Sequence, residues 1–279
     1  MRVFVTGAGG QVGTELVAAF ADHDVIAADH ARLDVADRDQ VHQAIGGTRP
    51  DVVVHAAAWT AVDACEGDPD RAMATNALAT RHVAEAAHRA GATVCYLSTD
   101  YVFDGEKADP YHEWDDTNPR SVYGRSKLGG EWELGDGDTI VRTSWVCGEH
   151  GPNMVKTILR LAAEHDTLSF VDDQRGHPTF ADDLAEMIRR LVTGRRSGLF
   201  HVTNQGAVSW YEFARATLEC AGDDPERVRA IRTADLQPAR PAPRPANSVL
   251  DNAALRLSGT ALLPDFGEPL ARLVATLQR

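Results

Sequence analysis

Three glycines at a spacing of three residues constrain the fold of this chain more than any other feature. Gly7, Gly10 and Gly13 lie in the segment GAGGQVG, which follows a β-rich run, RVFVT, and leads into a helical pattern of apolar positions over residues 11–20. Glycine can adopt positive φ angles and lets a phosphate approach the backbone. The first turn of a helix offers free N–H groups and the positive end of its dipole to that phosphate. This order of strand, glycine turn and helix predicts a dinucleotide-binding unit.

Strands and helices alternate through the rest of the first half. The strands are apolar throughout, which favours a parallel sheet covered by helices on both faces. The predicted fold class is α/β: a Rossmann-type doubly wound parallel sheet with a smaller C-terminal substrate-binding lobe. Strands are expected at residues 25–28, 51–55, 93–97 and 139–142, and helices at residues 11–20, 37–45 and 69–90, with another helix around 123–127.

After about Ser144 the alternation becomes less regular. Residues 238–245 read PARPAPRP, which cannot form a helix or a central strand and predict a loop over the surface or across a cleft. We therefore expect an NAD(P)-binding Rossmann domain at residues 1–144. Residues 145–279 would be mainly a substrate-binding lobe, with some segments returning to pack on the Rossmann domain. Helices are expected here at residues 153–164, 180–191, 210–220 and 268–277, and strands at 168–171 and 199–202.

The composition is strongly acidic. The formal net charge is -13, and Lys107, Lys127 and Lys156 are the only lysines. This balance argues against nucleic-acid binding, which requires a basic surface. It favours a salt-adapted host, in which ions screen the repulsion between carboxylates, with an ordinary acidic cytosolic enzyme as the alternative. With no apolar run of roughly 18 residues, no signal peptide and only scattered cysteines, we expect a cytoplasmic protein without a membrane partner.

The second predicted strand ends in a residue that bears on the choice of cofactor. Asp29 lies roughly 20 residues beyond the glycines, where a carboxylate can bind the ribose hydroxyls of NAD. Arg32 can instead meet the 2′-phosphate of NADP, so we expect NADH or NADPH, with NADH slightly favoured. Two further sets lie where the dinucleotide would run: Asp34 and Val35 beside the adenine, and the small residues Ala56, Ala57 and Ala58 after the third strand, which also suit close helix–sheet packing.

The segment SVYGRSK places a tyrosine and a lysine four residues apart. On a helix, Tyr123 and Lys127 would lie on one face, one turn from each other. A neighbouring cation lowers the pKa of a tyrosine, whose unperturbed value is about 10. Thr99 and Asp100 end the fourth strand, at the edge where α/β sheets bind ligands. A hydroxyl, a tyrosine and a lysine beside a dinucleotide site predict hydride transfer with tyrosine as the acid.

Longer strings narrow the prediction. In chain order they are GQVG, PDVVVHAAAWTAVDACE, STDYVFDG, YGRSKLGGE, VRTSW, DDQRGHPT, SWYEFA and RPANSVLD. Together they closely resemble the dTDP-4-dehydrorhamnose reductase family of the extended short-chain dehydrogenase/reductases. The resemblance implies NAD(P)H-dependent reduction of the 4-keto group of dTDP-4-dehydro-6-deoxy-L-mannose, a nucleotide sugar, to dTDP-L-rhamnose for glycan synthesis.

The same resemblance implies roles for individual residues. Tyr123 would donate the proton, Lys127 would hold the nicotinamide ribose and lower the tyrosine pKa, and Thr99 would hydrogen-bond the substrate oxygen. The pyrophosphate would be held by Gly10, Gln11 and Val12. The substrate would be bound by Asp100, Trp145, Gln174, Arg244 and Asn247. Arg240 and Arg244 are candidates for the diphosphate, with plain surface charge as the equal alternative.

Several alternatives stay open. His55 stands where the family would place an asparagine, and Glu15 could ligate Mg²⁺ in a homodimer, although no motif supports a metal site. A dehydratase or epimerase of another nucleotide sugar is the close rival. A dehydratase of this type has a glutamate after the Thr–Asp pair, whereas Tyr101 follows Asp100 here, which favours a reductase. A non-catalytic nucleotide-binding regulatory subunit is the rival from another class.

Overall fold

The computed structural model describes all residues 1–279, and its centre is a six-stranded parallel sheet in the order β10-β5-β4-β3-β1-β2. Each neighbouring pair in this sheet runs parallel. The Rossmann-type sheet predicted from the alternation is therefore confirmed. The strands are β1 (Arg2–Thr6), β2 (Asp24–Ala28), β3 (Val52–His55), β4 (Thr93–Thr99), β5 (Thr139–Thr143) and β10 (Gly198–His201).

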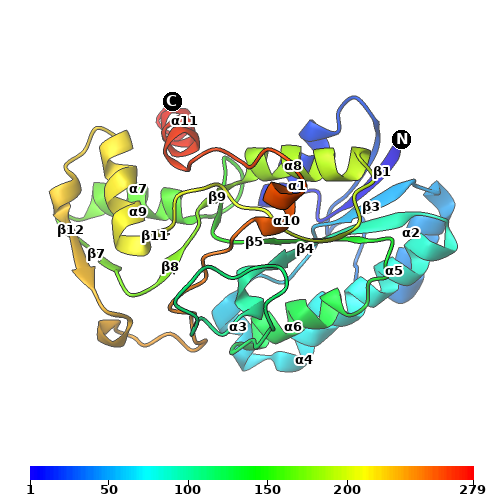
Figure 1. Ribbon diagram of the computed structural model, residues 1–279, viewed down its shortest axis with the longest axis horizontal. Coiled ribbons are helices and arrows are strands. Elements are labelled where there is room, and N and C mark those ends of the chain that lie inside the picture. Colours follow the sequence, from blue (N-terminus) through cyan, green and yellow to red (C-terminus); the bar gives the residue numbers. More distant parts are fainter.

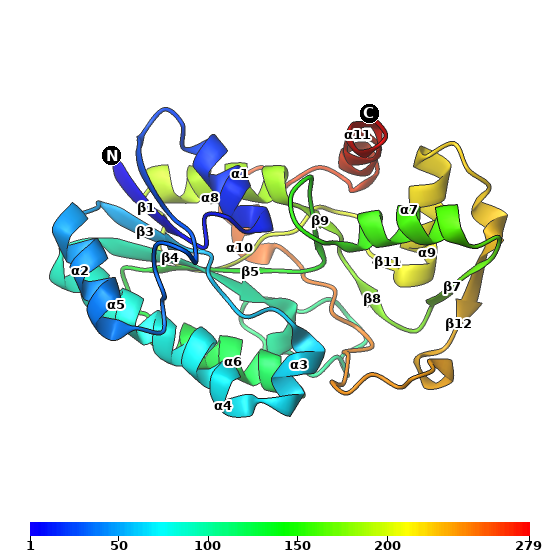
Figure 2. The same ribbon diagram turned by 180° about the vertical axis from the view of Figure 1, so that it is seen from behind.

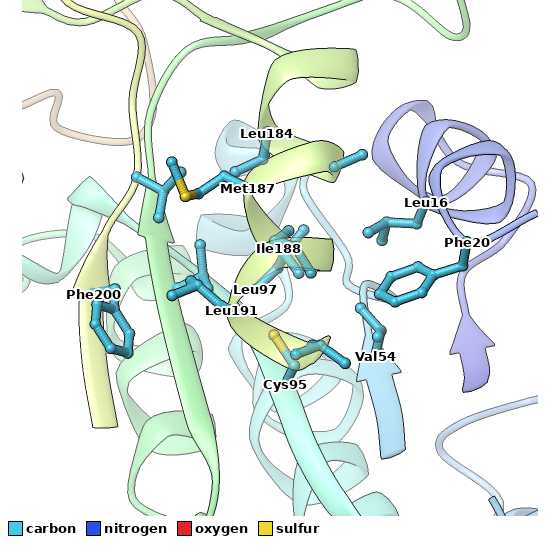
Figure 3. Packing of buried hydrophobic residues seen from close by; sticks show 14 of the residues in the cluster. Leu16, Phe20, Val54, Cys95, Leu97, Leu184, Met187, Ile188, Leu191 and Phe200 are labelled. Atoms are coloured by element: carbon cyan, nitrogen blue, oxygen red, sulfur yellow. The ribbon is translucent and has the colours of Figure 1, made fainter. Parts of the chain in front are cut away.

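Helices cover both faces of the sheet (Figures 1 and 2). One face carries α1 (Gln11–Ala19), α8 (Ala181–Thr193) and α10 (Ala253–Leu257). Figure 3 shows Leu184, Ile188 and Leu191 of α8 pointing at the strands, with Leu16 of α1 and Phe20, which follows α1, beside them. The other face carries α2 (Arg38–Thr48), α5 (Ala79–Arg89) and α6 (Val122–Glu131).

The strand predicted at 199–202 joins this sheet as its outermost strand, β10, next to β5. Helix α8 likewise comes from the second half of the chain and packs against α1. Residues beyond 145 therefore complete the first-half sheet and one of its layers.

A smaller lobe lies at the β5 side of the sheet and contains three pairs of short strands (Figure 1). Helices α7 (Met154–Glu164), α9 (Trp210–Cys220) and α11 (Gly267–Leu277) pack around its own apolar cluster. The pairs are β7 (Leu168–Val171) with β12 (Val228–Ile231), β8 (Arg175–Gly176) with β11 (Val208–Ser209), and β6 (Val146–Cys147) with β9 (Thr179–Phe180). Single 3₁₀ turns, η3 (Pro225–Arg227) and η4 (Thr233–Asp235), flank β12.

The long helix predicted at 69–90 is wrong in one respect, because it is not one regular α-helix. It consists of α4 (Pro69–Ala72), a π-helical segment η1 (Met73–Leu78) and α5. Within the π segment, Asn76 uses its side chain to accept from the Trp59 N–H at 2.7 Å and to donate to the Ser126 hydroxyl at 2.9 Å. A π-helical segment widens the turn, and such segments are frequent at functional sites.

Two short helices follow the strand ends nearest to this segment. Helix α3 (Val62–Gly67) follows β3, and the 3₁₀ turn η2 (Asp100–Val102) follows β4. No helix of the structure is both long and apolar enough to cross a bilayer.

Candidate active site

Helix α6 carries the predicted tyrosine and lysine, and its start is fixed twice. The Ser121 hydroxyl accepts from the Gly124 N–H at 3.0 Å, which is a side-chain N-cap. Glu66 of α3 accepts from the Val122 N–H at 2.7 Å. Two of the free donors at this helix end are thereby satisfied, and the first turn, which bears Tyr123, is held against α3.

Tyr123 is buried beside the end of β4. Its ring meets that of Tyr101 edge to face, with ring centroids 5.6 Å apart. Burial raises the pKa of Tyr123 above its ordinary value, the Asp100 charge adds to this rise, and a hydrogen bond with Thr99 opposes it. The expected lowering of this pKa by Lys127 is therefore wrong for the structure, because burial and the Asp100 charge dominate. The phenol is protonated at neutral pH, as a proton donor must be.

Lys127 lies one turn further along α6 and is also buried. Its ammonium donates to the Leu97 carbonyl at 2.6 Å and stands 4.0 Å from the centroid of the Tyr96 ring. Burial lowers the pKa of Lys127 to about 7, and the nearby Glu131 carboxylate works in the opposite direction. This site therefore holds a cation whose charge is lost just above neutral pH.

Thr99 and Asp100 end β4 next to Tyr123. The Thr99 hydroxyl donates to Asp100 Oδ1 at 2.9 Å, and the other carboxylate oxygen of Asp100 has no hydrogen-bond partner although it is buried. Burial raises the pKa of Asp100 to about 6, and the neighbouring hydroxyls of Ser248 and Thr99 oppose the rise. A buried carboxyl with one free oxygen beside a buried phenol is suited to contact a polar substrate.

The glycine turn is shaped to admit a pyrophosphate. Gly7 has φ +66°, and a Cβ added there would lie 2.7 Å from the Ala57 N–H group. A Cβ on Gly13 would lie 2.0 Å from the Gly7 carbonyl, so α1 approaches the turn as closely as glycine allows. Helix α1 begins at Gln11 behind Gly10, which has no side chain to cap it. The first N–H groups of α1 thus remain for a ligand, and these residues fit a dinucleotide.

The Gln11 side chain, in contrast, faces the smaller lobe. Its amide donates to the Val146 carbonyl at 3.0 Å and accepts from the Asn153 amide at 2.8 Å. Asn153 in turn caps α7. The Gln11 side chain is thus engaged elsewhere, and Gln11, like its neighbour Val12, would contact a pyrophosphate through its backbone N–H.

The residues predicted around the adenosine end of the cofactor differ in how accessible they are. Asp29 follows β2 and accepts from the Ala31 and Arg32 N–H groups at 3.1 and 3.0 Å, which shapes the turn there. Asp34 and Arg32 are exposed, whereas Val35 is buried in the core below the sheet. Ala56, Ala57 and Ala58 follow β3 and are half-buried.

His55, the residue found in place of the expected asparagine, ends β3 and is completely buried. Its Nδ1 is 2.7 Å from the Thr6 hydroxyl of β1, and its ring stacks on that of Tyr96. Burial, together with the nearby charge of Lys127, lowers the pKa of His55 to about 3. His55 is therefore neutral and belongs to the packing under Lys127.

The residues predicted to bind substrate are spread over the two halves. Gln174 donates to the Thr233 hydroxyl at 2.8 Å within the smaller lobe. Asn247 donates to the Lys107 carbonyl at 2.8 Å. The Arg244 guanidinium makes a bidentate contact with the Asp63 carboxylate, with two hydrogen bonds of 2.8 Å each. Trp145 follows β5, whose last residue pairs with Thr99, so it lies at the same sheet edge as the catalytic candidates.

Sequence reasoning missed three further features. Asp63 of α3 had no motif to single it out. Glu131 lies four residues after Lys127, a helical spacing that could have indicated it, and forms a buried ion pair with Arg142 at 2.6 Å. Trp210 stacks on Trp145 with ring centroids 3.5 Å apart.

No group of three or more histidines, cysteines or acids that could hold a metal ion is found. Glu15, the candidate Mg²⁺ ligand, lies 3.7 Å from the His150 ring.

A family model and several relatives of about 40% identity point to the same family. The model of the family described as "RmlD substrate binding domain" matches residues 1–279. A dTDP-4-dehydrorhamnose reductase of Streptomyces griseus is 43% identical, over 92% of this chain and 88% of that protein. The chain belongs to the dTDP-4-dehydrorhamnose reductase family. The resemblance predicted from the sequence strings is thereby confirmed.

Two other relatives inform the choice of ligands. A solved structure of dTDP-4-dehydrorhamnose reductase from Bacillus anthracis in complex with NADP is 38% identical, with TM-score 0.94 over 99% of both chains. A probable dTDP-4,6-dihydroxy-2-methyloxan-3-one 4-ketoreductase of Streptomyces antibioticus is 41% identical, over 97% of this chain and 93% of that protein. This chain is thus similar to 4-ketoreductases with two different dTDP-linked substrates.

Proposed function

We propose that this protein is an NAD(P)H-dependent reductase of a dTDP-linked 4-keto-6-deoxysugar, and that its substrate is dTDP-4-dehydro-6-deoxy-L-mannose, which it converts to dTDP-L-rhamnose for glycan synthesis. The observation that carries the proposal is the placement of Tyr123, Lys127 and Thr99 at one sheet edge in a chain of this family. The protonated state of the Tyr123 phenol supports its role as the acid.

The residues of the chain divide the work of the reaction. A bound nicotinamide cofactor supplies the hydride that reaches the keto carbon. Tyr123 gives its phenolic proton to the oxygen as it becomes an alkoxide, and Thr99 hydrogen-bonds the same oxygen. The Lys127 ammonium binds the nicotinamide ribose and stabilises the phenolate that Tyr123 leaves behind. Burial of Tyr123, Lys127 and Asp100 keeps water away from the reacting atoms.

The cofactor would lie across the carboxyl ends of β1, β2 and β3. The Gly7–Gly13 turn and the start of α1 would bind the pyrophosphate, and Asp29 the adenosine ribose. We propose that both NADH and NADPH are used, since Arg32 beside Asp29 can pair with a 2′-phosphate, and the Bacillus anthracis relative was solved with NADP. Mg²⁺ has no site in this proposal.

The diphosphate of the substrate would bind Arg244. This guanidinium is 16% exposed and is the better held of the two candidates, because Arg240 is 56% exposed and lies 3.5 Å from Asp63. Arginine forks match phosphate geometry and remain charged at any working pH. Asp100 and Trp145 would contact the sugar, and Gln174 and Asn247 would shape the loops around the nucleotide.

We further propose that residues 1–144 form a cofactor-binding domain and that residues 145–279 form mainly a substrate-binding lobe. We also propose that the protein is cytoplasmic, does not bind nucleic acid and can form a homodimer. The net charge of -13 with only three lysines supports a salt-adapted host. Thermal unfolding at rising KCl tests the last point: a melting temperature that rises up to molar salt is expected, and a fall would contradict it.

The function is tested by supplying dTDP-4-dehydro-6-deoxy-L-mannose and following the absorbance of NADH or NADPH. Oxidation of the cofactor with formation of dTDP-L-rhamnose is expected, and no oxidation with any dTDP-4-keto sugar would overturn the reductase claim. Turnover of another keto-sugar in preference would instead favour a relative such as the Streptomyces antibioticus ketoreductase. Conversion without net cofactor oxidation would indicate an epimerase or dehydratase.

A further inference from the structure

A pair of stacked tryptophans joins the two halves of the molecule. The indole rings of Trp145 and Trp210 are nearly parallel, at 9°, with centroids 3.5 Å apart. Aromatic pairs usually prefer offset or edge-to-face arrangements, with centroids about 4.5–7 Å apart. Such close face-to-face contact therefore requires that the surroundings hold both rings.

The backbone of Trp145 is also unusual. Its φ is +46°, in the left-handed region that bulky residues rarely adopt. The Trp145 carbonyl accepts from the Thr179 N–H at 3.2 Å, which ties this turn to the connector between β8 and α8. Strained residues of this kind persist only where the surrounding structure determines them, and they concentrate at functional sites.

The smaller lobe provides a slot for the Trp145 ring. Its edge faces Gly176 of β8, where an added Cβ would lie 2.6 Å from the indole carbon Cε2. Any residue other than glycine at 176 would therefore displace the ring. Trp210 closes one face of the ring, so glycine and tryptophan together determine where Trp145 lies.

Trp210 itself is fixed by the start of α9. Ser209 and Glu212 form a capping box, with the Ser209 hydroxyl accepting from the Glu212 N–H and the Glu212 carboxylate accepting from the Ser209 N–H. The Ser209 hydroxyl also donates to Asp172 at 2.6 Å, and β11 pairs with β8. Figure 1 shows β8, β11 and α9 together in the smaller lobe. Trp210 and Gly176 thus belong to one rigid unit.

We propose that Trp210 is a positioning residue for substrate binding: it holds Trp145 in its slot at the sheet edge, so that the Trp145 ring forms a wall of the sugar pocket. This inference rests on the proposed function, in which Trp145 contacts the sugar. Trp210 acts through Trp145 and touches no reacting atom. Its loss should therefore weaken substrate binding more than it slows the chemical step.

The test compares Trp210→Ala and Trp210→Phe with the wild type. Trp210→Ala should raise the KM for the keto-sugar about tenfold, and weaken calorimetric binding of dTDP-L-rhamnose equally, with kcat within about twofold. Trp210→Phe, which keeps a flat ring, should restore KM to within about threefold. Trp114→Ala and Trp132→Ala are the controls, since these side chains are 69% and 76% exposed.

Circular dichroism gives a readout that does not depend on turnover. Two stacked indoles produce an exciton-coupled signal, which should vanish in Trp145→Phe and Trp210→Phe and persist in Trp114→Phe and Trp132→Phe. Two results would overturn this inference and leave the proposed function standing. The first is an active wild type together with a Trp210→Ala variant whose KM is unchanged. The second is a circular dichroism signal that survives the loss of either stacked ring. A wild type that oxidises no cofactor with any keto-sugar would overturn the proposed function, and the circular dichroism would still decide whether Trp210 stacks on Trp145.

Discussion

The two halves of the molecule are built in different ways. The six-stranded sheet pairs strands of four to seven residues in continuous parallel register, and its catalytic candidates sit on its strand ends and on α6. The smaller lobe has two pairs of two-residue strands and takes its shape from capping boxes, ring stacks and long-range polar contacts. A continuous sheet edge suits catalytic groups that must be held in a fixed geometry, and loops and short strands suit a binding surface whose shape can change more easily.

Removing the proposed proton donor should produce the largest effect. In Tyr123→Phe we expect kcat to fall by about 10²–10⁴-fold, because the alkoxide then has no positioned acid. Cofactor binding should be unchanged, since the phenol hydroxyl is the only group removed. Steady-state NADPH oxidation and equilibrium NADPH binding measure the two quantities. Tyr211→Phe, on α9 in the smaller lobe, is the matched control, and wild-type activity in Tyr123→Phe would remove this residue from the mechanism.

The buried ion pair behind the site should matter next. Glu131 and Arg142 are each 5% exposed, and the Ser98 hydroxyl also donates to Glu131 at 2.5 Å. In Glu131→Gln the Arg142 cation is left buried without its counter-charge. We therefore expect the free energy of unfolding to fall by about 3–5 kcal/mol in denaturant titration.

A more exposed pair, formed by Glu133 just after the end of α6, provides the comparison. Glu133 accepts from Arg81, but these side chains are 23% and 53% exposed. Glu133→Gln should therefore change the free energy of unfolding by less than about 1 kcal/mol. Equal losses in the two variants would show that the buried pair has no special part in holding β4, β5 and α6 together.

The same contrast explains how much the sequence could predict. The glycine turn, the strand ends and the Tyr123–Lys127 spacing are local patterns, and each lies where it was predicted. The pairing of β10 with β5 involves residues far apart in the chain. Apolar strands indicate a parallel sheet, but no local pattern indicates which strands are neighbours in it. The break at Met73–Leu78 depends on contacts of Asn76 with Trp59 and Ser126, which a helical pattern does not contain.

The substrate side was harder to predict for the same reason. Arg244 is 181 residues away from Asp63, and neither string in which they occur indicates the pairing. Trp145 was expected in the sugar pocket, but the string SWYEFA, which contains Trp210, gives no sign that this residue stacks on Trp145. Strands of two residues, such as β8 and β11, are too short for alternation to be visible.

Arg244 allows the substrate side to be tested separately from the chemistry. Arg244→Ala should raise the KM for the nucleotide sugar about ten- to hundredfold, the range expected for loss of a charge-assisted hydrogen bond. The KM for NADPH should not change. Arg240→Ala should have less than about a threefold effect, because this side chain is 56% exposed. Equal effects of the two variants would indicate general positive charge instead of a defined diphosphate contact.

The pH dependence of binding should differ between the two halves. Burial lowers the pKa of Lys127 to about 7, so its ammonium is charged below this pH and neutral above it. Burial also works against the charge of Arg244, but the hydrogen bond to Asp63 contributes to a net rise in its pKa, and Arg244 stays charged. Cofactor binding should therefore depend on pH in the neutral range, whereas diphosphate binding should not.

The kcat/KM for NADPH reports the ionisation of the free enzyme and is the quantity to measure. It should be level below pH 7 and fall above it, by up to about tenfold per pH unit, as the charge that attracts the ribose and phosphates is lost. The KM for the nucleotide sugar at saturating NADPH should stay constant between pH 7 and 9, since Asp100, with a pKa of about 6, is already ionised there. A level profile for NADPH up to pH 9 would show that the free enzyme does not recruit its cofactor through the Lys127 charge, and would leave the glycine turn and the start of α1 as the binding determinants of that half.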